Sequence, residues 1–170
     1  MNIKNFEFKA KVEDLDQYEN KLLELKPVFH GLDHQIDTYF NVPKGRLKLR
    51  EGNIESSLIN YDRQDTADMK QSEVILYRHE PNKALKDILV KQLGVKKIVD
   101  KKRKIYFIDN VKFHFDTVET LGTFIEVEVI DDKDAFTTEQ LKEQCDKYFH
   151  FFRLSKSQLI DRSYSDLVIG

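Results

Sequence analysis

The stretch Asn5-Phe6-Glu7-Phe8-Lys9-Ala10-Lys11-Val12 decides the fold, because polar and apolar residues alternate through it without a break. Successive side chains of a β-strand point to opposite faces of a sheet, so this alternation predicts a strand. A single strand of this kind is typical of a half-solvated sheet. Its polar face carries Asn5, Glu7, Lys9 and Lys11, and its apolar face carries Phe6, Phe8, Ala10 and Val12.

The same alternation recurs in residues 45–51, 99–107, 111–116 and 123–129. Each stretch therefore predicts a further strand with one charged face. In residues 99–107, four consecutive cations leave open which side chains face which way. The charged residues that share a face are Arg46, Lys48 and Arg50 in the first stretch, Lys101 and Arg103 in the second, and Glu126 and Glu128 in the last.

These charged faces meet one another only if the strands form one sheet that closes into a barrel, with its apolar outer face covered by helices. A charged lumen is costly unless a ligand and counterions neutralise it. Lys and Arg side chains recognise phosphate oxygens, and carboxylates suit Mg²⁺ or Mn²⁺. A metal-bound polyphosphate satisfies both requirements.

Composition excludes several classes of function. The 170 residues fit one domain, 1–170, since no Pro-, Gly- or Ser-rich linker divides them. A net charge of -2 argues against nucleic acid as the partner. Cys145 is the single cysteine, which excludes an internal disulfide and favours a cytoplasmic location. No apolar run is long enough to predict a membrane span.

Four helices are expected between the strands. Helical spacing of apolar residues predicts one helix over residues 14–26, a second from Pro81 to Gly94, a third after Thr137 and a last one over residues 154–167. A tight hairpin at Asp109-Asn110 indicates an antiparallel sheet, so the class is α+β. The third helix should bury Leu141, Cys145, Tyr148 and Phe149.

Three polar side chains are ambiguous. His114 could transfer protons or bind a metal, but no second ligand stands at a matching spacing, so we expect a structural role. Asp37 and Tyr39 alternate with their neighbours and point either into the barrel or toward solvent. Both readings stay open.

The first stretch, written Asn5-x-Glu7-x-Lys9, resembles the Glu-x-Glu-x-Lys signature of the CYTH family. This family comprises the triphosphate tunnel metalloenzymes, among them class IV adenylyl cyclases and thiamine triphosphatases. The resemblance spans nearly the whole chain and is nearest in look to the class IV cyclases. The later blocks that resemble the family, in order, are residues 34–40, 45–50, 101–103, 115–128 and 163–167.

The resemblance implies an eight-stranded antiparallel β-barrel, the triphosphate tunnel, with helices packed outside, and it is compatible with a homodimer. It implies that Glu7, Glu126 and Glu128 hold Mg²⁺ or Mn²⁺. Lys9, Arg50 and Asp116 would take part in catalysis by positioning and by neutralising developing charge. The residues implied to bind the substrate are Lys9, Lys11, Arg46, Lys48, Arg50, Arg63, Lys101 and Arg103.

Two departures from the family pattern matter. Asn5 stands where the family has its first Glu, and an amide supplies neither negative charge nor a proton-accepting base. Arg63 and Lys70 stand where other branches carry a Lys-containing strand. Three functions therefore stay open: cyclisation of ATP to cyclic AMP and pyrophosphate, hydrolysis of inorganic or thiamine triphosphate, and a sensor that binds a triphosphate or nucleotide without turnover.

Overall fold

The computed structural model describes residues 2–62 and 69–168 of the chain, and the predicted strands form a closed antiparallel barrel within them. Arg63 lies outside the described residues. The strands are β1 (Asn2–Lys11), β2 (Val28–Phe40), β3 (Arg46–Gly52), β4 (Ser56–Asp62), β5 (Lys70–Arg78), β6 (Val95–Ile108), β7 (Val111–Val118) and β8 (Gly122–Asp131).

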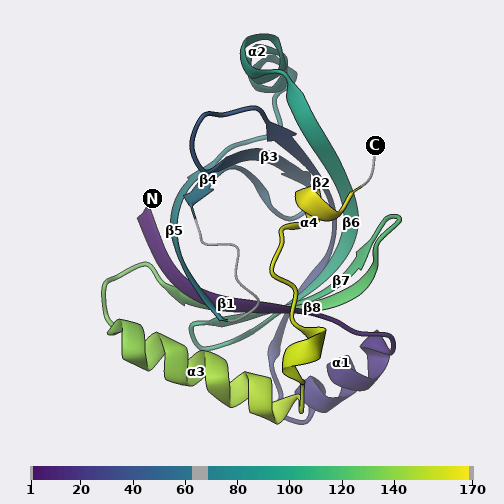
Figure 1. The fold of residues 1–170 in the computed structure, drawn as a ribbon, viewed down its shortest axis with the longest axis vertical. Helices are drawn as coiled ribbons and strands as arrows, with labels where there is room; N and C mark the ends of the chain where they lie inside the picture. Colours follow the sequence, from purple (N-terminus) through teal and green to yellow (C-terminus); the bar gives the residue numbers. More distant parts are fainter. Residues whose placement is uncertain (1, 63–68, 169–170) are drawn as a thin grey trace.

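The barrel closes in the order β1-β5-β4-β3-β2-β6-β7-β8, with β8 pairing back onto β1 (Figure 1). This confirms the predicted eight-stranded antiparallel barrel. Register fixes which residues face one another across strands: Lys9 lies opposite Glu126, and Arg103 lies opposite Asp116. The pairing also settles the facing of β6, since Lys101 and Arg103 are buried while Lys102 is exposed.

The apolar face of β1 packs outward against helices α1 (Leu15–Leu23) and α3 (Thr138–Phe151), which lie along one side of the barrel in Figure 1. Phe8 is 2% exposed and meets Phe149 of α3 edge to face, with ring centroids 5.6 Å apart. Full burial of a side chain of this size is worth about 1.5 to 3 kcal/mol. The four residues predicted to form the core face of α3 are its buried residues, Leu141, Cys145, Tyr148 and Phe149.

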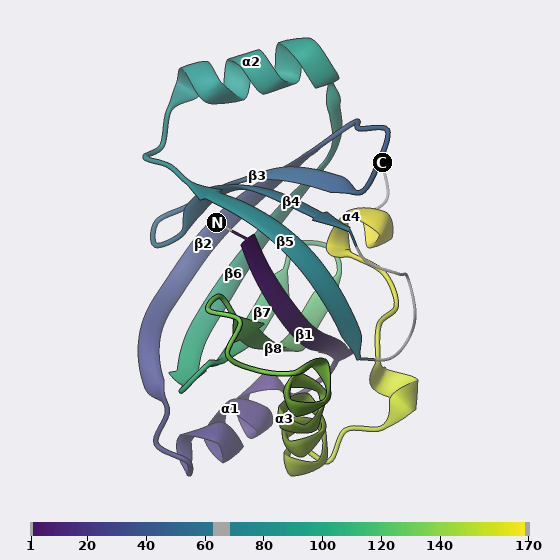
Figure 2. The same ribbon diagram turned by 90° about the vertical axis from the view of Figure 1, so that its left-hand side faces the viewer.

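Helix α2 (Lys83–Leu93) stands apart above the barrel wall (Figure 2). The Asn82 side chain caps it by accepting a hydrogen bond from Ala84 N, and Gly94 ends it with φ at 71°, which glycine adopts without strain. The helix was expected where it occurs, but none of its residues is buried.

The predicted last helix over residues 154–167 is wrong. The chain there forms a short 3₁₀ turn at Lys156–Gln158, an extended stretch and a one-turn helix α4 (Tyr164–Leu167). The extended stretch pairs with β1, since Ile160 N donates to Lys9 O at 2.9 Å and Leu159 bridges to Ala10. The C-terminal segment therefore runs along one end of the barrel (Figure 2).

None of the helices in the described part of the chain has the length and apolar character needed to cross a membrane.

Candidate active site

The inward-facing side chains enclose a cavity of about 1040 Å³ inside the barrel. Cations from several strands line it, while β4 and β5 add an apolar wall. Ile59, Val74 and Leu76 form this apolar part, so the charged side chains of the lumen come mainly from the other strands. The cations that line the cavity include Lys9, Lys48, Arg50, Lys101 and Arg103.

Three of these cations contact the carboxylate of Asp37. Arg50 donates to both of its oxygens, Nε to Oδ1 at 2.9 Å and Nη2 to Oδ2 at 2.8 Å. Lys101 Nζ donates to Oδ2 at 2.6 Å, and Lys48 Nζ lies 3.5 Å from the same oxygen. Burial opposes the charge on Asp37, but Arg50, Lys101 and Lys48 hold its pKa well below the ordinary value. Asp37 therefore points inward and holds these cations in place.

Burial affects the pKa of both lysines that contact Asp37, and it lowers that of Lys101 well below the ordinary value. Burial, with the charge of Arg50 beside it, lowers the pKa of Lys48 to about 8. Its ammonium group is therefore only partly charged in mildly alkaline solution. A bound anion would favour the charged form.

Asp116 plays the same part for Arg103. Arg103 donates from Nε to Oδ1 and from Nη2 to Oδ2, both at 2.7 Å, and Asp116 is fully buried. Tyr164 of the C-terminal segment donates its hydroxyl to Asp116 Oδ2 at 2.8 Å. The Tyr164 ring also lies 3.7 Å from Lys9 Nζ, which gives a cation–π contact at the end of the barrel that this segment covers.

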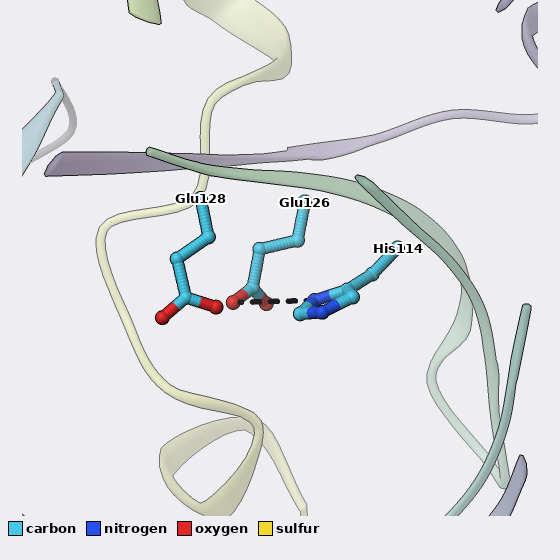
Figure 3. Close-up of side chains that lie close together, drawn as sticks. All are labelled: His114, Glu126 and Glu128. Carbon is cyan, nitrogen blue, oxygen red and sulfur yellow. Dashed lines mark ion pairs between the residues drawn. The ribbon is translucent and has the colours of Figure 1, made fainter. Parts of the chain in front are cut away.

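An acidic group on β7 and β8 adjoins the basic cluster, since Arg103 Nη2 lies 3.7 Å from Glu126 Oε2. His114, Glu126 and Glu128 each offer a ligand atom, and these atoms all lie within 4.8 Å of one another (Figure 3). Lys9 Nζ is 3.8 Å from Glu126 Oε2. Burial opposes ionisation, but Lys9 and Arg103 hold the pKa of Glu126 well below its usual value. Burial and Arg103 lower the pKa of His114 to about 4, so its imidazole is neutral.

This donor set fits a divalent cation. Carboxylate oxygens and a neutral imidazole are ligands that Mn²⁺ and similar ions accept. Asn5 on β1 donates from Nδ2 to Glu128 Oε1 at 2.6 Å and so orients that carboxylate. Glu7 faces Glu128 in register and lines the cavity, but its carboxylate is not one of the three groups in the cluster.

The predicted site residues divide into two sets. Three with described positions do not line the cavity: Lys11 is exposed, Arg46 donates to Asp166 at 2.9 Å, and Asp116 lies behind Arg103. Lys70 begins β5 opposite Glu7. Those that line the cavity are Glu7, Lys9, Lys48, Arg50, Lys101, Arg103, Glu126 and Glu128.

Two contacts of the cavity were not predicted from the sequence. One is the ion pair of Lys112 with Glu55, and the other is the contact of Tyr164 with Lys9. Lys112 donates to Glu55 at 2.6 Å, and both line the cavity. The alternation of residues 111–116 contained the signal for Lys112, since it shares a face with His114. Tyr164 gave no such signal, because only the pairing of the C-terminal segment with β1 brings it to Lys9.

The sequence model of the CYTH domain family matches residues 4–164 of this chain. No curated protein matches it. Among solved structures, a protein from Pyrococcus horikoshii OT3 is 24% identical with a TM-score of 0.83, covering 97% of this chain and 99% of that one. A proposed adenylate cyclase from Vibrio parahaemolyticus is 19% identical with a TM-score of 0.78, covering 96% of each chain.

A third structure is that of a proposed adenylyl cyclase from Hippeastrum, described as revealing a dominant triphosphatase activity. It is 11% identical with a TM-score of 0.59, covering 96% of this chain and 91% of that one. The similarity of this chain to these three structures is one of fold. The family match extends over most of the sequence, and the chain belongs to the CYTH domain family.

Proposed function

We propose that the protein is a divalent metal-dependent enzyme that cleaves a triphosphate inside the barrel, by a class IV adenylyl cyclase type of reaction that converts ATP to cyclic AMP and pyrophosphate. The observation that carries this proposal is that buried cations and the carboxylates of Glu126 and Glu128 line one cavity, with His114 beside the two carboxylates. A triphosphate needs both, since cations bind its oxygens and a divalent ion compensates its remaining charge.

The basic side chains have separate parts in this proposal. Arg50 and Lys101 are held by Asp37, and Arg103 is held by Asp116, so the positions of their side chains are fixed before a substrate arrives. Preorganised cations of this kind stabilise charge that develops on phosphate oxygens without reorganising during the reaction. Asp116 acts through Arg103 as a positioning residue, because it does not line the cavity.

Mg²⁺ or Mn²⁺, held by Glu126 and Glu128 with Glu7 nearby, would polarise the phosphate oxygens when bound. In the cyclase reaction, the ribose 3′ oxygen bonds to the α-phosphorus while the bond from that phosphorus to pyrophosphate breaks, and the hydroxyl proton leaves to solvent. The cations of the cavity would bind the phosphate oxygens and so orient the α-phosphorus and the pyrophosphate leaving group.

The size and lining of the cavity support an organic triphosphate over inorganic triphosphate. Its volume of about 1040 Å³ is at the upper end of ligand pockets, which span about 300 to 1,000 Å³. Apolar side chains lie at strand ends away from the C-terminal segment, where a nucleoside would sit. These side chains are Ile3, Ile54, Phe107 and Ile130.

Hydrolysis is the second candidate. The same cations and carboxylates would serve attack by water on the terminal phosphorus, and the similar Hippeastrum protein is described by a dominant triphosphatase activity. Asn5 in place of a carboxylate supports a third reading, a sensor that binds without turnover.

One experiment separates these functions. The purified protein is incubated with Mn²⁺ or Mg²⁺ and, separately, ATP, inorganic triphosphate and thiamine triphosphate, and products are identified by phosphorus NMR and nucleotide chromatography. Cyclic AMP with pyrophosphate is the expected result. Orthophosphate release would replace the cyclase by a triphosphatase, and binding without any product would replace both by the sensor.

A further inference from the structure

His114 lies buried in the middle of β7 with both ring nitrogens unsatisfied. It is 1% exposed, and within the described residues neither Nδ1 nor Nε2 has a hydrogen-bond partner. Buried polar atoms nearly always have such a partner, because losing water without replacement costs about 1 to 3 kcal/mol. A purely space-filling role would be served better by an apolar side chain. The imidazole therefore requires another explanation.

The separation between His114 and Glu126 favours a shared ion over a direct contact. His114 Nδ1 lies 3.7 Å from Glu126 Oε1, which is too long for a hydrogen bond. First-row divalent ions bind imidazole nitrogen and carboxylate oxygen at about 2.0 to 2.2 Å, so two ligands of one ion lie about 3 to 4.4 Å apart. The observed distance falls inside that range.

The surrounding strands point the three side chains at one another. His114 and Glu126 are directly opposite in the β7–β8 ladder, so their side chains leave the sheet on the same face. Glu128 follows two residues later on that face, and the three converge in Figure 3. Asn5 donates to Glu128 Oε1, and within the described residues no hydrogen bond is made to the other oxygen of that carboxylate.

We propose that His114 is a nitrogen ligand of the cation held by Glu126 and Glu128, and that it makes this site select Mn²⁺ over Mg²⁺. Mg²⁺ prefers an all-oxygen octahedron and gains little from imidazole, whereas nitrogen ligands suit the first-row transition ions. The inference rests on the proposed metal-dependent function, but it concerns which ion binds and through which atom.

The test reads the ligand atom directly and does not depend on activity. Mn²⁺ is added to the full-length protein, and pulsed electron paramagnetic resonance looks for coupling of the manganese to an imidazole ¹⁴N nucleus. Titration calorimetry then compares Mn²⁺ and Mg²⁺ affinities in wild type, His114→Gln and His150→Gln. His150 is a matched control, since it is exposed on α3 outside the barrel.

We expect ¹⁴N coupling in wild type and in the His150 variant, and its loss in His114→Gln. Mn²⁺ affinity should fall roughly tenfold or more in His114→Gln, while Mg²⁺ affinity should change much less. Mn²⁺ binding without ¹⁴N coupling in the wild-type protein overturns the inference even if the variant fails to fold. Metal-dependent turnover in that same protein would leave the proposed function standing. Absence of any Mn²⁺ or Mg²⁺ binding would overturn both.

Discussion

Asn5 donates a hydrogen bond of 2.6 Å to Glu128 across the β1–β8 ladder, at the position where the CYTH signature has its first glutamate. Asn5 Oδ1 is itself buried and has no hydrogen-bond partner within the described residues. The amide thus donates a hydrogen bond to the acidic cluster, which a further carboxylate at this position would have made more negative.

Asn5→Glu should destabilise the metal-free protein and make its stability depend on metal. The change replaces a donated hydrogen bond by a contact between like charges, which we expect to cost about 1 to 3 kcal/mol. Thermal melting with a chelator, and then with Mn²⁺, measures both effects. Asn20→Glu, at an exposed position of α1, is the control. An unchanged melting temperature in the metal-free variant would contradict this account of Asn5.

Asp116→Asn should destabilise the fold strongly. The substitution leaves the buried Arg103 guanidinium without its bidentate partner, and breaking a buried ion pair in this way costs about 3 to 5 kcal/mol. Chemical denaturation measures the free energy of unfolding. The control is Asp87→Asn, which breaks the exposed pair with Lys83 on α2 and should cost less than about 1 kcal/mol. Equal losses in the two variants would argue against a buried, preorganised Arg103.

Triphosphate affinity should fall as pH rises through about 8. The pKa of Lys48 is about 8 in the free protein, and a bound polyanion raises it, so binding takes up protons near this pH. Affinity is therefore highest where Lys48 is already charged, below that pKa. Calorimetry of inorganic triphosphate between pH 7 and 9, in buffers of different ionisation enthalpy, counts the protons.

Lys48→Arg keeps the charge but does not titrate in this range, so its proton uptake near pH 8 should be smaller than that of wild type. Equal uptake in both proteins would show that Lys48 is not the titrating group.

Arg50→Lys should weaken triphosphate binding by roughly tenfold and change the melting temperature little. The planar fork that donates to Asp37, and that in the proposed function binds phosphate oxygens, is lost, but Lys101 and Lys48 still contact Asp37. Calorimetric affinity and melting temperature are measured together, with the exposed Arg162→Lys as control. A large fall in melting temperature at unchanged affinity would mean that Arg50 serves the fold alone.

The barrel could be predicted from the sequence because alternation is local. The alternation within each strand, as in Asn5 to Val12, shows which side chains share a face. Only the closure of the sheet into a barrel had to be inferred. The last helix could not be predicted, since residues near Ile160 pair with β1 rather than forming helical hydrogen bonds. That choice depends on a strand about 150 residues earlier in the chain, which no local pattern records.

The site could be predicted only in part for the same reason. Glu126 and Glu128 lie two residues apart on one strand, so their spacing alone predicts that they share a face. His114 lies beside Glu126 only because of the register between β7 and β8. The facing of Asp37 was open until β3 placed Arg50 opposite it. Side chains that depend on pairing between strands need the register before they can be assigned.

The most direct test of the central claim measures phosphate and pyrophosphate release from ATP by the wild-type protein and by the double variant Glu126→Gln, Glu128→Gln, with Mn²⁺ and with a chelator. Gln keeps the size of each side chain but removes the charge that would hold the ion. We predict release that requires metal in wild type and is abolished in a variant that still folds. Release that continues without metal, or at the wild-type rate in the folded variant, would contradict a metal-dependent triphosphate reaction in this tunnel.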